Sequence, residues 1–335
     1  MNKTYAPCGY FLWDFWLFAE AGKYHLYHLQ APLKQDAHSR HSAASVGYAV
    51  SENLRDWQPR GTVLEASENP ADWDSVSIWT GCTIKKDGRY YMFYTSRCRQ
   101  EVLENGYMGH TQRIGVAWSE DLKLWHKYEY NPVLSVGGSE YYENQAEAYN
   151  RHEGCRDPFV ILDETGGTYY MFFTARDKRG EPRSRGCIGR ARSKDLLNWE
   201  LLPPAASPHT FVDMEVPTLH RHQGKWYLLF AVKKDWYSPA HQQAILPAKP
   251  QTGELYLVAD RLDGQFEPMA TDNVISGTAD GLYTGRIVKD TKEQDVFLAW
   301  GVGPDEGFAA TEASYRLSLP RRVLYDEQGK MMLEK

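Results

Sequence analysis

Three acidic residues, far apart in the chain, have the side chains that cleavage of a glycosidic bond requires. Asp14 follows a tryptophan, Asp157 lies between Arg156 and a proline, and Glu215 precedes a valine and a proline. Sugar hydrolysis uses two carboxyl groups that flank the bond, one held protonated as an acid and one ionised. A third carboxylate beside an arginine suits the binding of sugar hydroxyls. This chemistry requires a fold that brings the three residues together.

Two simpler interpretations of these residues involve no catalysis. The pair of Arg156 and Asp157 is also typical of a salt-bridged loop corner, because isolated ion pairs are common and contribute little stability. A group of carboxylates that lines a channel would also be able to bind a cation. The position of each acid in the fold distinguishes these interpretations.

A repeated unit predicts that fold. Each copy contains a glycine turn, an aromatic-rich strand, a strand with small residues, a polar turn and a closing aromatic residue. The turn glycines of four copies are Gly22, Gly88, Gly167 and Gly224, and a shorter fifth copy covers residues 295–300. Glycine turns between apolar runs are strong hairpin signals. The repeat predicts an all-β fold, a five-bladed β-propeller with four antiparallel strands in each blade around a central channel, as a single domain over residues 1–335.

The repeat also places the acidic residues. Asp14, Trp79, Asp157 and Glu215 lie 8, 9, 10 and 9 residues before their turn glycines. The strand before the first hairpin of a blade is the innermost one and lines the channel. We therefore expect the three carboxylates to converge at one end of the channel. Like charges in a narrow cleft repel one another and are costly to desolvate, which favours a catalytic role.

The composition argues against several classes of partner. The chain has 38 Lys and Arg residues against 44 Asp and Glu residues, so nucleic acid and anionic membranes are not expected partners. No apolar run approaches membrane-spanning length, and the N-terminus has no signal-peptide pattern. Five scattered cysteines favour reduced thiols. We expect a cytoplasmic protein.

With these residues in place, the chain resembles glycoside hydrolase families 32 and 68, the β-fructofuranosidase and levansucrase-like propellers. The segment 13–16 is similar to a Trp-Asp-x-Trp nucleophile motif, 79–81 to a motif of blade two, and 156–158 to the Arg-Asp-Pro of these families. Glu215 occupies the place of the acid/base glutamate. Residues 280–283 and 298–300 resemble blade five.

The resemblance implies a retaining double displacement on the β-fructofuranosyl bond of sucrose or a short fructo-oligosaccharide, with water or another sugar as acceptor. Asp14 would be the nucleophile and Glu215 the acid and base. Asp157, held by Arg156, would bind sugar hydroxyls and support the transition state. We expect no cofactor and no metal.

Six residues are predicted to bind the substrate: Trp13, Trp16, Trp79, Thr80, Arg156 and Tyr283. The tryptophans would wall the sugar pocket, although buried blade aromatics give the same pattern. Thr80 would donate a hydrogen bond to the nucleophile, unless it is only a β-branched strand residue. Tyr283 fits a channel wall or the core equally well. The segment 220–222, His-Arg-His beside a glycine turn, is expected to be a solvated turn rather than a metal site.

Departures from the family pattern bear on the substrate. Leu29 stands where the resemblance expects a substrate-binding glutamine, and Gln30 should face the other way because strand side chains alternate. Val216 follows the acid/base position in place of Cys or Arg, and no C-terminal β-sandwich is expected. The alternatives are an inverting glycosidase similar to family 43, acting on another glycoside such as an arabinofuranoside, and a non-catalytic sugar-binding propeller.

Overall fold

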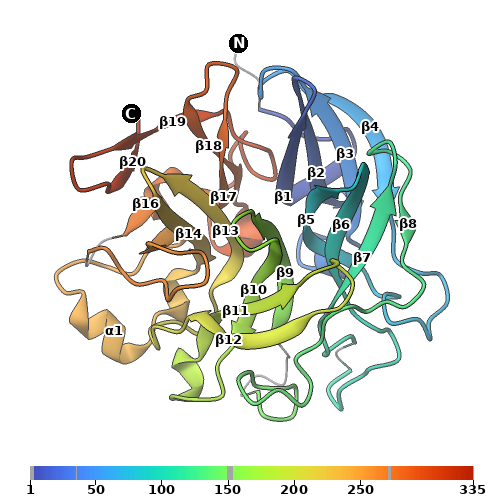
Figure 1. Ribbon diagram of the computed structural model, residues 1–335, viewed down its shortest axis with the longest axis horizontal. Helices are drawn as coiled ribbons and strands as arrows, with labels where there is room; N and C mark the ends of the chain where they lie inside the picture. The colour runs from blue at the N-terminus through green and yellow to red at the C-terminus, as the bar shows by residue number, and fades with distance from the viewer. Residues whose placement is uncertain (1–3, 35, 107, 149–153, 271–272, 335) are drawn as a thin grey trace.

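The computed structural model describes residues 4–34, 36–106, 108–148, 154–270 and 273–334. Within these ranges, five sheets of four antiparallel strands are arranged like blades around a common centre (Figure 1). Each blade follows the chain order of its strands, so blade one comes first and blade five last. The predicted five-bladed β-propeller is confirmed.

The strands of each blade run from the centre outwards. Blade one contains β1 (Tyr10–Glu20), β2 (Lys23–Pro32), β3 (Ser45–Ser51) and β4 (Gln58–Leu64), and blade two contains β5 (Ile78–Lys86), β6 (Arg89–Ser96), β7 (Arg113–Ser119) and β8 (His126–Lys127). Blade three contains β9 (Cys155–Asp163), β10 (Thr168–Arg176), β11 (Gly186–Ser193) and β12 (Glu200–Ala206). Blade four contains β13 (Glu215–His222), β14 (Lys225–Val232), β15 (Gly253–Ala259) and β16 (Val274–Ser276). Blade five contains β17 (Leu282–Lys289), β18 (Asp295–Gly301), β19 (Arg321–Tyr325) and β20 (Met331–Leu333).

Two-residue turns join the first two strands in blades one, two and four. In blade two the turn residues Asp87 and Gly88 have φ angles of 50° and 80°, and the flanking residues Lys86 and Arg89 are paired. Positive φ at both positions gives the turn that matches the twist of a hairpin. The glycine turns therefore mark the inner hairpins, as the sequence predicts.

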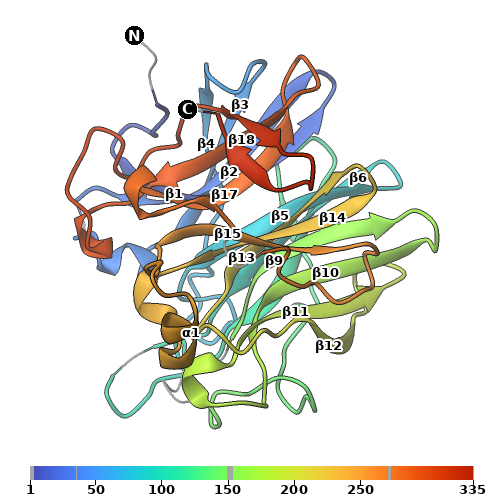
Figure 2. The ribbon, with the colours of Figure 1, turned by 90° about the vertical axis from the view of Figure 1, so that its left-hand side faces the viewer.

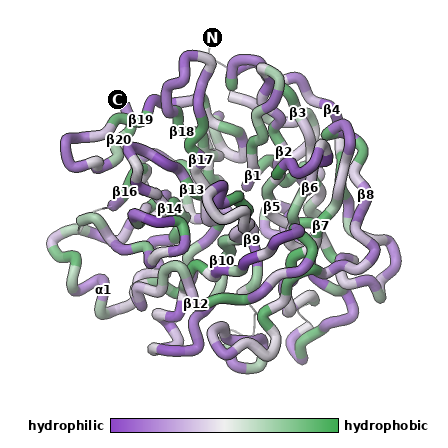
Figure 3. The backbone as a smooth tube through the Cα atoms, viewed as in Figure 1, coloured by the Kyte–Doolittle hydropathy of each residue, from purple (hydrophilic) through white to green (hydrophobic). Residues whose placement is uncertain are grey.

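The hydrophobic core lies mainly between neighbouring blades. One cluster joins blades two and three, another joins three and four, and a third joins four and five. The largest joins blade one to blades two and five, and includes Trp13, Ile78 and Trp300. Figure 2 shows the blades stacked face to face, and Figure 3 shows hydrophilic residues gathered on the outer loops. Each blade thus depends on both neighbours to bury its faces.

The loops contain the little helix that is present. The loop 233–252 includes the 3-10 turn η3 (Lys234–Trp236) and one turn and a half of α-helix, α1 (Pro239–Ala244). Short 3-10 turns also occur at η1 (Ser39–Ser42), η2 (Pro182–Ser184), η4 (Thr278–Asp280) and η5 (Pro304–Glu306). In the described residues, no helix has the length and apolar character needed to span a membrane.

Candidate active site

The five innermost strands each carry a β-bulge at the same level of the propeller. The register breaks at Asp14 in β1, at Thr80 in β5, at residues 157–158 in β9, at residues 216–217 in β13 and at residues 284–285 in β17. In every blade the inner strand carries one residue more than its partner. A bulge turns a side chain away from its regular direction and often lies beside an active site.

Backbone strain accompanies three of these bulges. Asp157, Val216 and Thr284 have φ angles of 58°, 54° and 49°, a region that side chains with a Cβ rarely occupy and that is most costly for β-branched residues. The strain is maintained by the packing around it. Asp157 itself, and the residues that precede the other two, Glu215 and Tyr283, line one cavity.

Asp14 is held in place by hydrogen bonds from two other blades. Thr80 of blade two donates its hydroxyl to Oδ2 at 2.8 Å. Thr284 and the indole of Trp300, both of blade five, donate to Oδ1 at 3.1 and 3.0 Å. Burial raises the pKa of the Asp14 carboxyl, whereas the Thr80 hydrogen bond opposes this shift. The predicted hydrogen bond from Thr80 to Asp14 is therefore present.

Glu215 has different partners. Arg156 donates from Nη2 to Oε1 at 2.8 Å, and the Tyr283 hydroxyl donates to Oε2 at 2.9 Å. The Glu215 side chain is 21% exposed, against 5% for Asp157. Glu215 is therefore more accessible than Asp157.

Asp157 is the most enclosed of the three acids. Its Oδ2 accepts the Thr174 hydroxyl at 2.9 Å and the backbone N–H of Val216 at 3.3 Å. Burial raises its pKa to about 7, against the opposing effect of Arg156. The closest approach of Arg156 Nε to Asp157 Oδ2 is 3.4 Å, longer than the 2.8 Å contact to Glu215. The expected ion pair of Arg156 with Asp157 is present, and the same guanidinium also binds Glu215.

The three acids line one cavity of about 410 Å³, a volume within the range of small-molecule sites. Five of the six predicted substrate-binding residues also line it: Trp13, Trp79, Thr80, Arg156 and Tyr283. Leu29 faces the cavity too, whereas Gln30 is buried and donates to the Thr62 hydroxyl at 2.8 Å. The predicted orientation of this pair is confirmed.

Trp16 does not line the cavity, in contrast to the prediction. It lies beyond the bulge in β1, where regular pairing has resumed. Its ring stacks on Tyr27, and its indole donates to the Thr83 hydroxyl at 3.0 Å. Trp16 is therefore a core residue at the contact of blades one and two.

The sequence did not identify several residues of the site. Trp300 and Thr284 hydrogen-bond the candidate nucleophile, and Arg40 stacks between Trp13 and Trp300 while pairing with Asp305 and Glu306. Arg97 lies 3.9 Å from the centre of the Trp79 ring. The only available signal was the resemblance of residues 298–300 to blade five, since the loop residues follow no repeat.

A second buried layer lies behind the acids. Glu254 of β15 is fully buried and accepts the backbone N–H of Gly285 at 2.8 Å. Arg286 is also buried and donates to the carbonyl of Val216 at 3.2 Å. Burial raises the pKa of Glu254 to about 8 and lowers that of Arg286. These hydrogen bonds support the bulge of blade five at Gly285 and the bulge of blade four at Val216.

Comparison with known proteins decides the family. Residues 16–335 match the profile of the glycosyl hydrolases family 32 N-terminal domain. The chain belongs to this family. Asp14 lies two residues before the matched span, so its assignment depends on the geometry described above.

The curated relatives of this family 32 chain include a levansucrase and a sucrase. A levansucrase from Pseudomonas savastanoi pv. glycinea is 24% identical over 273 residues, which cover 73% of this chain and 59% of that protein. An extracellular sucrase from Zymomonas mobilis subsp. mobilis is 27% identical over 228 residues, which cover 58% of this chain and 53% of that protein. The chain thus spans little more than half the length of these relatives.

Solved structures share the fold. An inulosucrase from Halalkalicoccus jeotgali bound to kestose superimposes with a TM-score of 0.75 at 20% identity, covering 100% of this chain and 91% of that one. Bacillus subtilis levansucrase superimposes with a TM-score of 0.74 at 16% identity, covering 98% and 87%. At this level of identity the likeness establishes the propeller fold alone.

Proposed function

We propose that the protein is a retaining glycosidase that cleaves the β-fructofuranosyl bond of sucrose or of a short fructo-oligosaccharide. The observation that carries the proposal is the contrast between Asp14 and Glu215 in one cavity. Asp14 accepts hydrogen bonds from three neutral donors, Thr80, Thr284 and Trp300, whereas Glu215 contacts the cation of Arg156 and the hydroxyl of Tyr283. Two carboxyl groups in different settings are what acid and nucleophile roles require.

Asp14 would attack the anomeric carbon of the fructosyl group. The hydroxyls of Thr80 and Thr284 and the indole of Trp300 fix the carboxylate in one orientation without neutralising it. A positioned nucleophile lowers the barrier because the attack needs no further ordering. The product of this step would be a covalent fructosyl-enzyme.

Glu215 would donate a proton to the leaving oxygen and then remove one from the incoming acceptor. Its side chain is 21% exposed, which allows it to exchange that proton with solvent between the two steps. Arg156 and Tyr283 hold the two oxygens, so the side chain has a fixed direction. General acid–base assistance of this kind contributes about 10²–10⁴-fold in rate.

Asp157 would bind sugar hydroxyls and support the positive charge that develops at the ring. Its Oδ2 is occupied by the Thr174 hydroxyl and the Val216 N–H. Asp157 is fixed from behind by these donors, and it also lines the cavity. An adjacent negative charge stabilises an oxocarbenium-like transition state.

One incubation tests the reaction and its stereochemistry. Purified protein is supplied with sucrose and methanol, and the methyl fructofuranoside formed is analysed by NMR. Methanol traps the fructosyl group as a stable glycoside whose anomeric configuration is preserved. Free fructose, by contrast, equilibrates between its anomers in water, so the configuration first formed can no longer be measured. We expect release of glucose and formation of the β-methyl glycoside.

Three other outcomes would favour other functions. The α-methyl glycoside would indicate inversion, as in the family 43-like alternative, and cleavage of an arabinofuranoside in place of sucrose would change the substrate. Binding of sucrose without glucose release would indicate a sugar-binding propeller. Parallel reactions with inulin, levan and sucrose alone would separate hydrolysis from transfer to sugar.

A further inference from the structure

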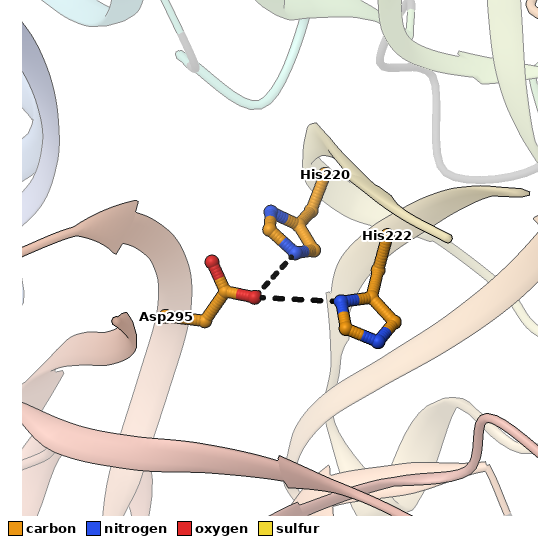
Figure 4. A group of neighbouring side chains, drawn as sticks. All are labelled: His220, His222 and Asp295. Carbon is orange, nitrogen blue, oxygen red and sulfur yellow. Dashed lines mark ion pairs between the residues drawn. The ribbon is translucent and has the colours of Figure 1, made fainter. Parts of the chain in front are cut away.

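Two histidines and an aspartate gather at the end of β13 that is remote from the cavity. His220 and His222 lie two residues apart on β13, and Asp295 begins β18 of blade five. Figure 4 shows both imidazole rings directed towards the Asp295 carboxylate. His220 and Asp295 are buried, so the expectation of a solvated turn is wrong for this segment.

The donor atoms are spaced as ligands of one ion would be. His220 Nε2 lies 3.2 Å and His222 Nδ1 lies 3.7 Å from Asp295 Oδ2, and all three donor atoms lie within 4.8 Å of one another. Ligands about 2.0–2.2 Å from a tetrahedral zinc ion are separated by about 3.4 Å. The three atoms therefore need only small shifts to share an ion.

We propose that His220, His222 and Asp295 form a binding site for a divalent transition metal such as Zn²⁺. Two imidazoles and one carboxylate bind borderline ions such as Zn²⁺ in preference to Mg²⁺ or Ca²⁺, because Mg²⁺ and Ca²⁺ take oxygen ligands. Alternation along β13 brings residues 220 and 222 to the same face of the strand. The ligand from blade five completes the set.

Two neighbours of the cluster affect this site. The Tyr325 hydroxyl lies 2.8 Å from His220 Nε2 and donates to Asp295 Oδ2 at 3.0 Å, so it is close enough to supply a fourth oxygen ligand. The Tyr325 ring stacks on His222 with a centroid distance of 3.5 Å, which fixes both side chains. Lys289 contacts the other oxygen, Asp295 Oδ1, at 2.7 Å and is half exposed. The Lys289 ammonium leaves Oδ2 available to the metal, but its positive charge repels the metal ion.

The site is separate from the proposed catalytic cavity. His220 is five residues beyond Glu215 on the same strand, roughly 16 Å at the usual rise of about 3.3 Å per residue. Its ligands come from β13 and β18, so a bound ion would link blade four to blade five. We expect metal binding to stabilise the folded protein and to leave sucrose cleavage unchanged.

Calorimetry with ZnCl₂ tests the site on the full chain after treatment with EDTA. The exposed Cys8 is replaced in all proteins by Cys8→Ser, because a surface thiol also binds zinc. We expect saturable binding of one ion per chain and a rise of a few degrees in the melting temperature. His222→Gln should weaken binding by at least about 10–100-fold, the loss found even for outer-shell partners.

Two further variants keep the test decisive. Lys289→Met removes the opposing charge at a half-exposed position and should strengthen zinc binding severalfold. His126→Gln removes an exposed histidine of β8, in another blade, and should change nothing. The proposal is overturned if zinc does not bind the parent protein, if His222→Gln binds as well as the parent, or if Lys289→Met weakens binding.

Discussion

The two ends of β13 differ in backbone as well as in chemistry. At the Glu215 end, the strand bulges at residues 216–217 and Val216 adopts a positive φ angle. At the other end, His222 and Lys225 pair regularly across a two-residue turn. The same division holds in blades one and two, where the bulged end faces the cavity and the hairpin end is regular. The difference indicates that regular pairing builds the propeller, whereas departures from it build the site.

The largest expected effect is at the bulged end, where Asp14→Asn should reduce kcat on sucrose by about 10⁴-fold or more. The amide keeps the shape of the side chain but cannot form the fructosyl-enzyme. Steady-state assays would measure the loss, and circular dichroism would confirm the fold. Wild-type turnover would remove Asp14 from the mechanism.

Glu215→Gln should reduce sucrose cleavage by about 10²–10⁴-fold, because the leaving oxygen loses its proton donor. Fructosyl fluoride offers a matched control, since fluoride leaves without protonation. We expect Glu215→Gln to lose much less activity on fructosyl fluoride than on sucrose, each measured relative to wild type. Asp14→Asn should lose activity on both substrates. An equal loss on both substrates would show that Glu215 does not act as the acid.

Trp300→Phe should reduce kcat/KM by about 10–100-fold. The change removes the indole donor to Asp14 and keeps the aromatic contact with Tyr283, and a hydrogen bond to a charged group contributes about 1.5–3 kcal/mol. Trp16→Phe is the matched control, because Trp16 is buried outside the cavity. Equal losses in the two variants would attribute the effect to packing.

Glu254→Gln should change stability by less than about 1 kcal/mol at pH 6, because the glutamate is mostly protonated there and the amide keeps the same shape. Burial raises the pKa of Glu254 from its ordinary 4.5 to about 8 in the folded state. Its stabilising contribution is therefore complete below about pH 4.5 and declines as the pH rises through 8. Urea unfolding from pH 5 to 9 should show a weaker decline for the variant. A loss of 3–5 kcal/mol at pH 6 would indicate an ionised pair with Arg286.

The smallest effect is expected at the hairpin end of β13. Gln223 occupies the first turn position with a φ angle of 47°. Gln223→Asn should stabilise the protein by a few tenths of a kcal/mol, because asparagine tolerates this region better. Thermal unfolding would show the gain, and sucrose cleavage should not change. A change in activity would contradict the independence of the two ends.

The repeat made the regular part of the molecule predictable. The glycine turns and aromatic strands predicted the blades, and the similar offset from each turn, 8 to 10 residues, predicted that Asp14, Asp157 and Glu215 lie close together. The bulges were not predictable, because one extra residue in a strand leaves no signal in composition or period. Trp16 was misplaced for that reason, and Thr284 and Arg286 were missed. Arg40 belongs to a loop whose path depends on contacts with blade five.

The hydrogen bonds to Asp14 have a consequence for folding of the chain. Trp300 and Thr284 reach Asp14 across 286 and 270 residues of sequence. Asp14 belongs to blade one, whereas these two partners belong to blade five, which follows it in the chain. Contacts of such long sequence separation are slow to form, because closing the long intervening loop costs entropy. The hydrogen bonds around Asp14 are therefore incomplete until blade five packs against blade one. Enzyme activity would then indicate that this last packing step has taken place.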